Sequence, residues 1–217
     1  FEDRFRPTIP FPVASRHVGQ RWRSSCPMED LSMSDLENAR RIWRLCQACA
    51  ATVRGAKPPS PAYADRTARL LFGTAAQESN LTWERQRTPR FEGKVGGFSK
   101  WQVEPGSVDA SLAYLRERPD VLARATEWLF ADPHAPVAWP DLIPMDALLW
   151  ALRLDDNDKL GVLFSRLHYF RVHDPIPESL ADQAAYWKHW YNTPAGSGTV
   201  EEYLANWNRY CRESANA

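Results

Sequence analysis

The sequence predicts an α+β fold that is mostly α-helical, with a small β-hairpin or sheet after the second helix. Over most of the chain, apolar residues recur at helical spacing. Glycines gather among short alternating segments only in residues 90–107, RFEGKVGGFSKWQVEPGS. Residues 1–28 contain four prolines and little periodicity, which excludes a long helix there. We therefore expect an extended proline-containing arm at 1–28 and one domain at 29–217.

Two helices are expected before the glycine-rich segment. Residues 32–53, SMSDLENARRIWRLCQACAATV, place apolar side chains on one face, and Ser34 followed by Glu37 matches a capping box. The loop GAKPPSP at 55–61 ends this helix. A second helix is expected over 62–77, with Leu70, Leu71 and Ala75 buried.

Helices are also expected to fill the chain after the glycine-rich segment. Proline and glycine punctuate the joins between the periodic stretches. The expected helical stretches are 107–130, 144–156, 158–172, 178–193 and 199–213.

Composition excludes several classes of partner. The 217 residues include 27 Lys and Arg against 27 Asp and Glu, so no global basic field attracts nucleic acid or an anionic membrane. No apolar run is long enough for a membrane span, and no secretory signal is present. Ten tryptophans are a high count, and we assign most of them to the core.

The cysteines predict neither a disulfide framework nor a metal site. Cys46 and Cys49 form a C-x-x-C inside a helical pattern, and no second such pair supplies the other ligands of a zinc site. Buried thiols are expected, with a disulfide to Cys26 or Cys211 as the alternative. The pair His168 and His173 does not share a helical face, so these are expected to be surface or hinge histidines, and no metal or cofactor is predicted.

The stretch LLFGTAAQESNL, residues 70–81, places Glu78 at the end of an apolar helical run. Three local effects raise the pKa of this carboxyl: burial in the apolar run, the negative end of the helix dipole, and the lack of a Lys or Arg within six residues. A glutamate that keeps its proton near neutral pH can protonate the leaving oxygen of a glycosidic bond. The alternative is a glutamate that points to solvent at a helix end.

Four stretches together resemble the lysozyme-like superfamily, and within it the soluble lytic transglycosylases, the goose-type lysozymes and phage-encoded relatives. These stretches are GTAAQESNL, GGFSKWQVEPGS, SRLHYFR and AAYWKHWYNTPAGSGTVEEYL. Their order, with a β element after the glutamate helix, carries the resemblance over roughly residues 60–210. The resemblance implies a lysozyme-like catalytic domain at 29–217.

The resemblance also implies roles for residues around the end of the second helix. Glu78 would be the catalytic acid, and Ser79 would help to orient it. Gln102 would bind the sugar from the β side of the cleft, and Glu104 would lie near the cleft wall. The alternatives are a Gln102 that hydrogen-bonds the loop and a Glu104 that, before Pro105, is a helix-start or turn carboxylate.

Three residues of the later helices complete the implied substrate site. Tyr169 would hydrogen-bond toward Glu78 or the N-acetyl group of the sugar, with a core tyrosine as the alternative. Tyr191 and Asn192 would close the far side of the groove, with a helix cap and its packing partner as the alternative.

Most glycosidases use a second carboxyl, and its identity is open here. Glu84, Glu92, Glu104 and Asp109 are candidates that spacing does not separate. Lytic transglycosylases manage with one glutamate, which acts first as acid and then as base on the muramyl C6 hydroxyl. The single clear glutamate favours that route, and hydrolysis remains the alternative.

The expected function is therefore cleavage of the β-1,4 bond between N-acetylmuramic acid and N-acetylglucosamine, by a muramidase or lytic transglycosylase. The partner is the peptidoglycan glycan strand, and the arm is a candidate contact with other virion or tail proteins. The expected setting is a phage virion or the host cell envelope (periplasm), as an entry lysin or an endolysin. The alternative is a non-catalytic virion or tail protein that retains the fold.

Overall fold

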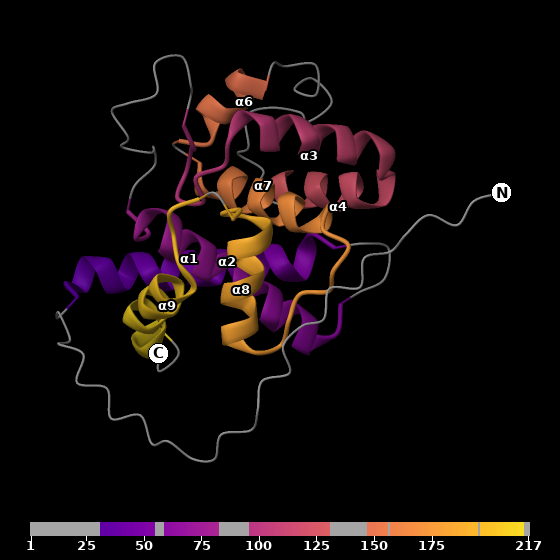
Figure 1. The fold of residues 1–217 in the computed structure, drawn as a ribbon. Coiled ribbons are helices and arrows are strands. Elements are labelled where there is room, and N and C mark those ends of the chain that lie inside the picture. Colours follow the sequence, from indigo (N-terminus) through magenta and orange to yellow (C-terminus); the bar gives the residue numbers. More distant parts are fainter. Residues whose placement is uncertain are drawn as a thin grey trace. The chain divides into compact units, whose positions relative to one another are not determined.

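Helices with clear start signals make up the regular structure (Figure 1). The computed structural model describes residues 31–54, 59–82, 96–130, 147–155, 157–194 and 196–214, so the predicted arm at 1–28 lies outside the described residues. The helices are α1 (Met33–Thr52), α2 (Pro61–Ser79), α3 (Pro105–Glu117), α4 (Pro119–Phe130), α6 (Ala147–Arg153), α7 (Asp158–Phe170), α8 (Leu180–Trp190) and α9 (Val200–Ser214). Each of the helical segments expected from periodicity overlaps at least one of them.

The predicted α+β class is wrong, because the described residues contain eight helices and no strand. Where a hairpin or sheet was expected, the described part of the segment has one isolated antiparallel bridge between Phe98 and Val103. Glu104 already caps α3 and Pro105 is its first residue, so the bridge cannot extend on that side. The segment is therefore a tight turn that leads directly into a helix.

Two helix boundaries differ from the sequence prediction for local reasons. The capping box of α1 pairs Ser32 with Asp35 instead of Ser34 with Glu37, and the Ser32 hydroxyl accepts from the Asp35 N–H at 3.2 Å. The single helix expected over 107–130 is two helices, because Pro119 disfavours helical geometry at Arg118 and starts α4.

Helix α2 packs against α1, α7, α8 and α9. Its small residues allow this close approach, and Gly73 is the clearest case. A Cβ at Gly73 would lie 2.0 Å from the hydroxyl oxygen of Tyr203, a buried residue of α9. The surroundings of α2 therefore desolvate any polar side chain at its end.

A second layer of contacts joins α3, α4 and α7, which lie together in Figure 1. Gly161 of α7 lets the 99–102 turn approach, since a Cβ there would lie 2.8 Å from the Ser99 hydroxyl oxygen. Trp101, at the tip of that turn, is fully buried and donates its indole N–H to the Leu71 carbonyl of α2 at 2.8 Å. The turn is thus held between α2 and α7.

The tryptophan and cysteine predictions are confirmed where the structure describes them. Trp101, Trp150 and Trp187 are fully buried. Cys46 and Cys49 are buried thiols on the core face of α1. Within the described ranges, no helix combines the length and apolar character that a membrane crossing requires.

Candidate active site

Glu78 lies in the last turn of α2, just before the left-handed cap residue Asn80. Its Oε1 accepts a hydrogen bond from the indole Nε1 of Trp187 in α8 at 3.0 Å. Burial raises the pKa of the Glu78 carboxyl from 4.5 to about 7. The Trp187 hydrogen bond and the Lys188 charge lower this pKa, whereas the Glu104 charge raises it. The carboxyl is therefore protonated in a substantial fraction of molecules at neutral pH.

The location of the proton follows from the hydrogen bond. An indole N–H can only donate, so Oε1 of Glu78 is the acceptor, and Oε2 is the oxygen that remains to carry the acidic proton. Trp187 is itself fixed by packing. It is fully buried, its ring centroid lies 5.3 Å from that of Tyr203, and a Cβ at Gly198 would lie 2.7 Å from its ring. The donor to Glu78 is thus rigidly placed.

Tyr169 of α7 reaches the same face of α2 one turn before Glu78. Its hydroxyl lies 2.8 Å from the Thr74 hydroxyl, which donates its only proton to the Leu70 carbonyl. The Tyr169 hydroxyl must therefore donate to Thr74 and can only accept elsewhere. Burial raises the pKa of Tyr169 well above its usual value, and the charges of Tyr203, Tyr191 and Glu78 raise it further.

Tyr191 caps the C-terminal end of α8 and joins it to the 99–102 turn. Its hydroxyl donates to the Trp101 carbonyl at 2.7 Å, and its ring centroid lies 5.3 Å from that of Tyr169. Burial raises the pKa of Tyr191, and the charge of Glu78 is the next largest cause. Tyr169 and Tyr191 thus both lie in the electrostatic neighbourhood of Glu78.

Gln102, in the turn that Tyr191 contacts, has a side-chain oxygen that accepts no hydrogen bond. Its backbone is left-handed with φ of 48°, and its Nε2 donates to the Ser99 carbonyl at 2.7 Å. Its Oε1 is buried and has no hydrogen-bond partner in the described structure. Gly97 makes this geometry possible, because a Cβ there would lie 2.5 Å from the Gln102 carbonyl oxygen. A buried amide oxygen without a partner is available to an N–H or O–H of a ligand.

The structure places the remaining predicted residues in different surroundings. Ser79 is buried and donates to the Ala75 carbonyl within α2 at 3.0 Å, so the hydrogen bond that orients Glu78 comes from Trp187. Glu104 is the exposed N-cap residue of α3 and acts on Glu78 through its charge. Asn192 accepts from the Lys188 ammonium at 2.8 Å.

The structure distinguishes the candidates for the second carboxylate by their placement relative to Glu78. Glu84 and Glu92 lie outside the described residues, and Asp109 is exposed on α3. Glu104 is the described candidate whose charge acts on the pKa of Glu78. Of the two candidates that the structure describes, Glu104 is therefore the better placed to serve beside Glu78.

Sequence reasoning missed Trp187 and Lys188, the two residues that lower the pKa of Glu78. Both stand in AAYWKHWYNT, where only Tyr191 and Asn192 were selected. Trp187 precedes Tyr191 by four residues and Lys188 precedes Asn192 by four, which is the spacing of neighbours on one helix face. That spacing was the available signal, although nothing local connects either residue to Glu78.

His168 is not a surface or hinge histidine. Arg171 Nη2, a donor, lies 3.1 Å from Nδ1, so Nε2 carries the proton and donates to the Trp190 carbonyl at 2.8 Å. Burial lowers the pKa of His168 to about 4, the hydrogen bond to Trp190 raises it, and the Arg171 charge lowers it. The residue is a neutral link between α7 and the end of α8. Among the described residues, no group of three His, Cys, Asp or Glu side chains could hold a metal ion.

Comparison of the chain with family models, with curated proteins and with solved structures gives no match.

Proposed function

We propose that the protein cleaves the β-1,4 bond between N-acetylmuramic acid and N-acetylglucosamine in peptidoglycan, as a muramidase or lytic transglycosylase with Glu78 as general acid. One observation carries the proposal: Glu78 keeps a proton near neutral pH while Trp187 holds its other oxygen. A carboxyl of this kind is what protonation of a glycosidic oxygen requires.

In the first step, Oε2 of Glu78 donates its proton to the bridging oxygen as the bond to the anomeric carbon breaks. The carboxylate that forms is stabilised by the Trp187 hydrogen bond and by the Lys188 charge, the two effects that lower its pKa. Burial and the Glu104 charge oppose ionisation. The pKa of Glu78 is therefore about 7, and both the protonated and the ionised carboxyl are populated near neutral pH.

In the second step, the Glu78 carboxylate acts as base. In the lytic route it takes the proton of the muramyl C6 hydroxyl, whose oxygen bonds to the anomeric carbon and gives a 1,6-anhydro product. In hydrolysis, water supplies that oxygen and Glu104 is the candidate second carboxylate. Oε1 of Gln102 and the hydroxyl of Tyr169 would accept hydrogen bonds from sugar N–H or O–H groups.

A zymogram on purified cell wall tests the proposal. The wild-type protein should clear the gel, Glu78→Gln should not, and Glu117→Gln, which alters an exposed carboxyl at the far end of α3, should clear like the wild type. Equal clearing by the wild type and Glu78→Gln contradicts catalysis by Glu78, whereas clearing by neither leaves a non-catalytic virion or tail protein. Mass analysis of the fragments then separates anhydro ends from reducing ends.

The biological setting is part of the same proposal. The phage-like stretches suggest a virion-associated lysin or an endolysin that acts in the host cell envelope. Release of labelled fragments from intact cells by purified virions, compared with release only at the end of infection, distinguishes these two settings.

A further inference from the structure

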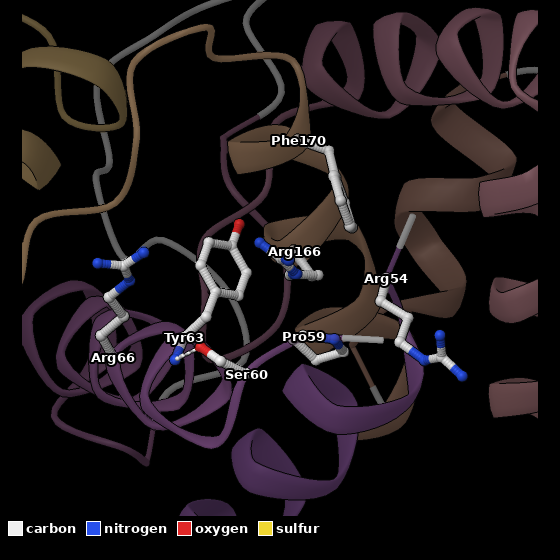
Figure 2. Close-up of a pocket in the computed structure, with 7 residues that line it drawn as sticks. All are labelled: Arg54, Pro59, Ser60, Tyr63, Arg66, Arg166 and Phe170. Carbon is white, nitrogen blue, oxygen red and sulfur yellow. Dashed lines mark hydrogen bonds between the residues drawn. The ribbon is translucent and has the colours of Figure 1, made fainter. Parts of the chain in front are cut away.

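A pocket of about 370 Å³ lies at the opposite end of α2 from Glu78. It is lined by the end of α1, the start of α2 and one face of α7, through Arg54, Pro59, Ser60, Tyr63, Arg66, Arg166 and Phe170 (Figure 2). Fifteen residues of α2 separate Tyr63 from Glu78. At about 1.5 Å per residue this is roughly 22 Å, so the pocket is separate from the candidate active site.

Arg166 is the unusual member of this lining, because its charge is buried and has no carboxylate partner in the described structure. The residue is 1% exposed. Its Nε donates to the Val53 carbonyl at 3.3 Å, but its Nη2 is buried and has no hydrogen-bond partner. Figure 2 shows the guanidinium between Tyr63 and Phe170, and its central carbon lies 3.9 Å from the Phe170 ring centroid. A buried charge with an unused donor is costly unless a ligand supplies the missing acceptor.

Two more arginines lie on either side of Arg166 in Figure 2. Arg66 pairs with Glu178 at 3.5 Å, but Glu178 is 89% exposed, and the buried Nε of Arg66 has no partner. Arg54 stands half-buried at the end of α1. Together with Glu178, the three guanidiniums leave a local charge of about +2. The positive end of the α2 dipole adds to this field.

We propose that the pocket binds a small organic phosphate monoester. A phosphate monoester carries a charge of about −1.5 to −2 at pH 7, which matches the local excess, whereas a single carboxylate does not. Guanidinium forks suit phosphate oxygens, and Arg166 holds such a fork with one arm unused. The pocket is larger than a phosphate group needs and falls in the range of small-molecule sites. The rings of Tyr63 and Phe170 offer an apolar wall for the organic part.

Isothermal titration of the full chain with phenyl phosphate tests the proposal, at constant ionic strength set with chloride. Inorganic phosphate and benzoate serve as separate arms for the phosphate group alone and for a carboxylate. The expected order of affinity is phenyl phosphate, then inorganic phosphate, then benzoate. Binding should weaken below about pH 6, where the phosphate gains its second proton.

Charge variants locate the binding. Arg54→Gln and Arg66→Gln should each weaken phenyl phosphate about tenfold, the scale of a lost charged hydrogen bond. Glu178→Gln should strengthen it, because Arg66 loses its competing partner. Arg124→Gln, at an exposed arginine of α4, is the matched control and should bind like the wild type. Arg166→Lys keeps the charge without the fork and should also weaken binding, with its unfolding midpoint measured to check the fold.

Three results would overturn the proposal. The first is phenyl phosphate binding no more strongly than chloride. The second is an unchanged affinity for phenyl phosphate in both Arg54→Gln and Arg66→Gln. The third is benzoate binding as tightly as phenyl phosphate. Equal affinity for phenyl phosphate and inorganic phosphate would overturn the role of the aromatic wall. Glu78→Gln should bind phenyl phosphate normally, so the outcome is independent of the proposed glycan cleavage.

Discussion

Replacing Glu78 with glutamine should stabilise the protein above neutral pH. Burial raises the pKa of Glu78 from 4.5 to about 7, so ionising it in the folded state costs about 3 kcal/mol, at about 1.36 kcal/mol per pKa unit. Glutamine has the same shape and keeps an amide oxygen for the Trp187 N–H. It carries no charge to desolvate, so this cost disappears.

The sign of the pH dependence follows from proton binding. Between pH 4.5 and 7 the unfolded chain has released the Glu78 proton while the folded protein retains it. The free energy of unfolding of the wild type therefore falls through this window because of Glu78 and levels off above it. The advantage of Glu78→Gln should be near zero below pH 4.5 and reach about 3 kcal/mol by pH 8.

Urea unfolding of both proteins from pH 4 to pH 8.5 measures this difference. The difference between the two proteins is the proper readout, because His168 acts in the opposite direction. Its pKa is lowered to about 4 in the folded state, so its contribution to stability rises with pH between about 4 and 6.5. That contribution is common to both proteins and cancels.

Two neighbouring variants sharpen the test. Glu104→Gln removes a charge that raises the pKa of Glu78, so the fall in stability should become smaller. Lys188→Met removes a charge that lowers this pKa, so the fall should become larger and extend above pH 7. If the difference between Glu78→Gln and the wild type does not change with pH, the prediction is wrong, because the Glu78 carboxyl then titrates alike in the folded and unfolded chains.

Further predictions concern packing and charge elsewhere. Gly73→Ala should destabilise the protein by about 2 kcal/mol despite the better helix propensity of alanine, because its Cβ would lie 2.0 Å from the Tyr203 hydroxyl oxygen. Gly106→Ala, where no atom lies within 4 Å of the added Cβ, should stabilise it by up to about 1 kcal/mol, and urea unfolding that ranks the two alike would contradict this packing argument. Asp158→Asn should cost about 1 to 3 kcal/mol, because Asp158 loses the charge that pairs with the Lys100 ammonium at 2.9 Å and with the Arg41 guanidinium. An unchanged melting temperature in Asp158→Asn would show that this ion pair contributes nothing.

Local sequence signals predicted the helices well because apolar spacing and start residues act within one or two turns. They placed α2 within two residues at its C-terminal end and gave the correct direction for the pKa of Glu78. They failed to choose between two overlapping patterns at the start of α1. Ser32 with Asp35 and Ser34 with Glu37 both have the spacing of a capping box, and only the structure shows that the first pair is used.

The β prediction failed because glycines occur both between short strands and wherever two backbone segments approach closely. Alternation and glycine in residues 90–107 suggested strands, but Gly97 permits a close approach to the Gln102 backbone, and Trp101 anchors the turn to α2. The hydrogen bond to Glu78 was also beyond local reasoning, since 109 residues separate Glu78 from Trp187. Contacts of that range depend on how the helices pack.

The packing of Tyr203 against α2 determines when the surroundings of Glu78 are completed during translation. Its hydroxyl meets the carbonyl of Leu70, which precedes it by 133 residues, and its ring braces Trp187. While α2 and α8 have left the ribosome and α9 has not, the Tyr203 side chain is missing from the space beside Gly73 and from its contact with the Trp187 ring. The packing that holds the Trp187 indole beside Glu78 is therefore completed only when α9 docks.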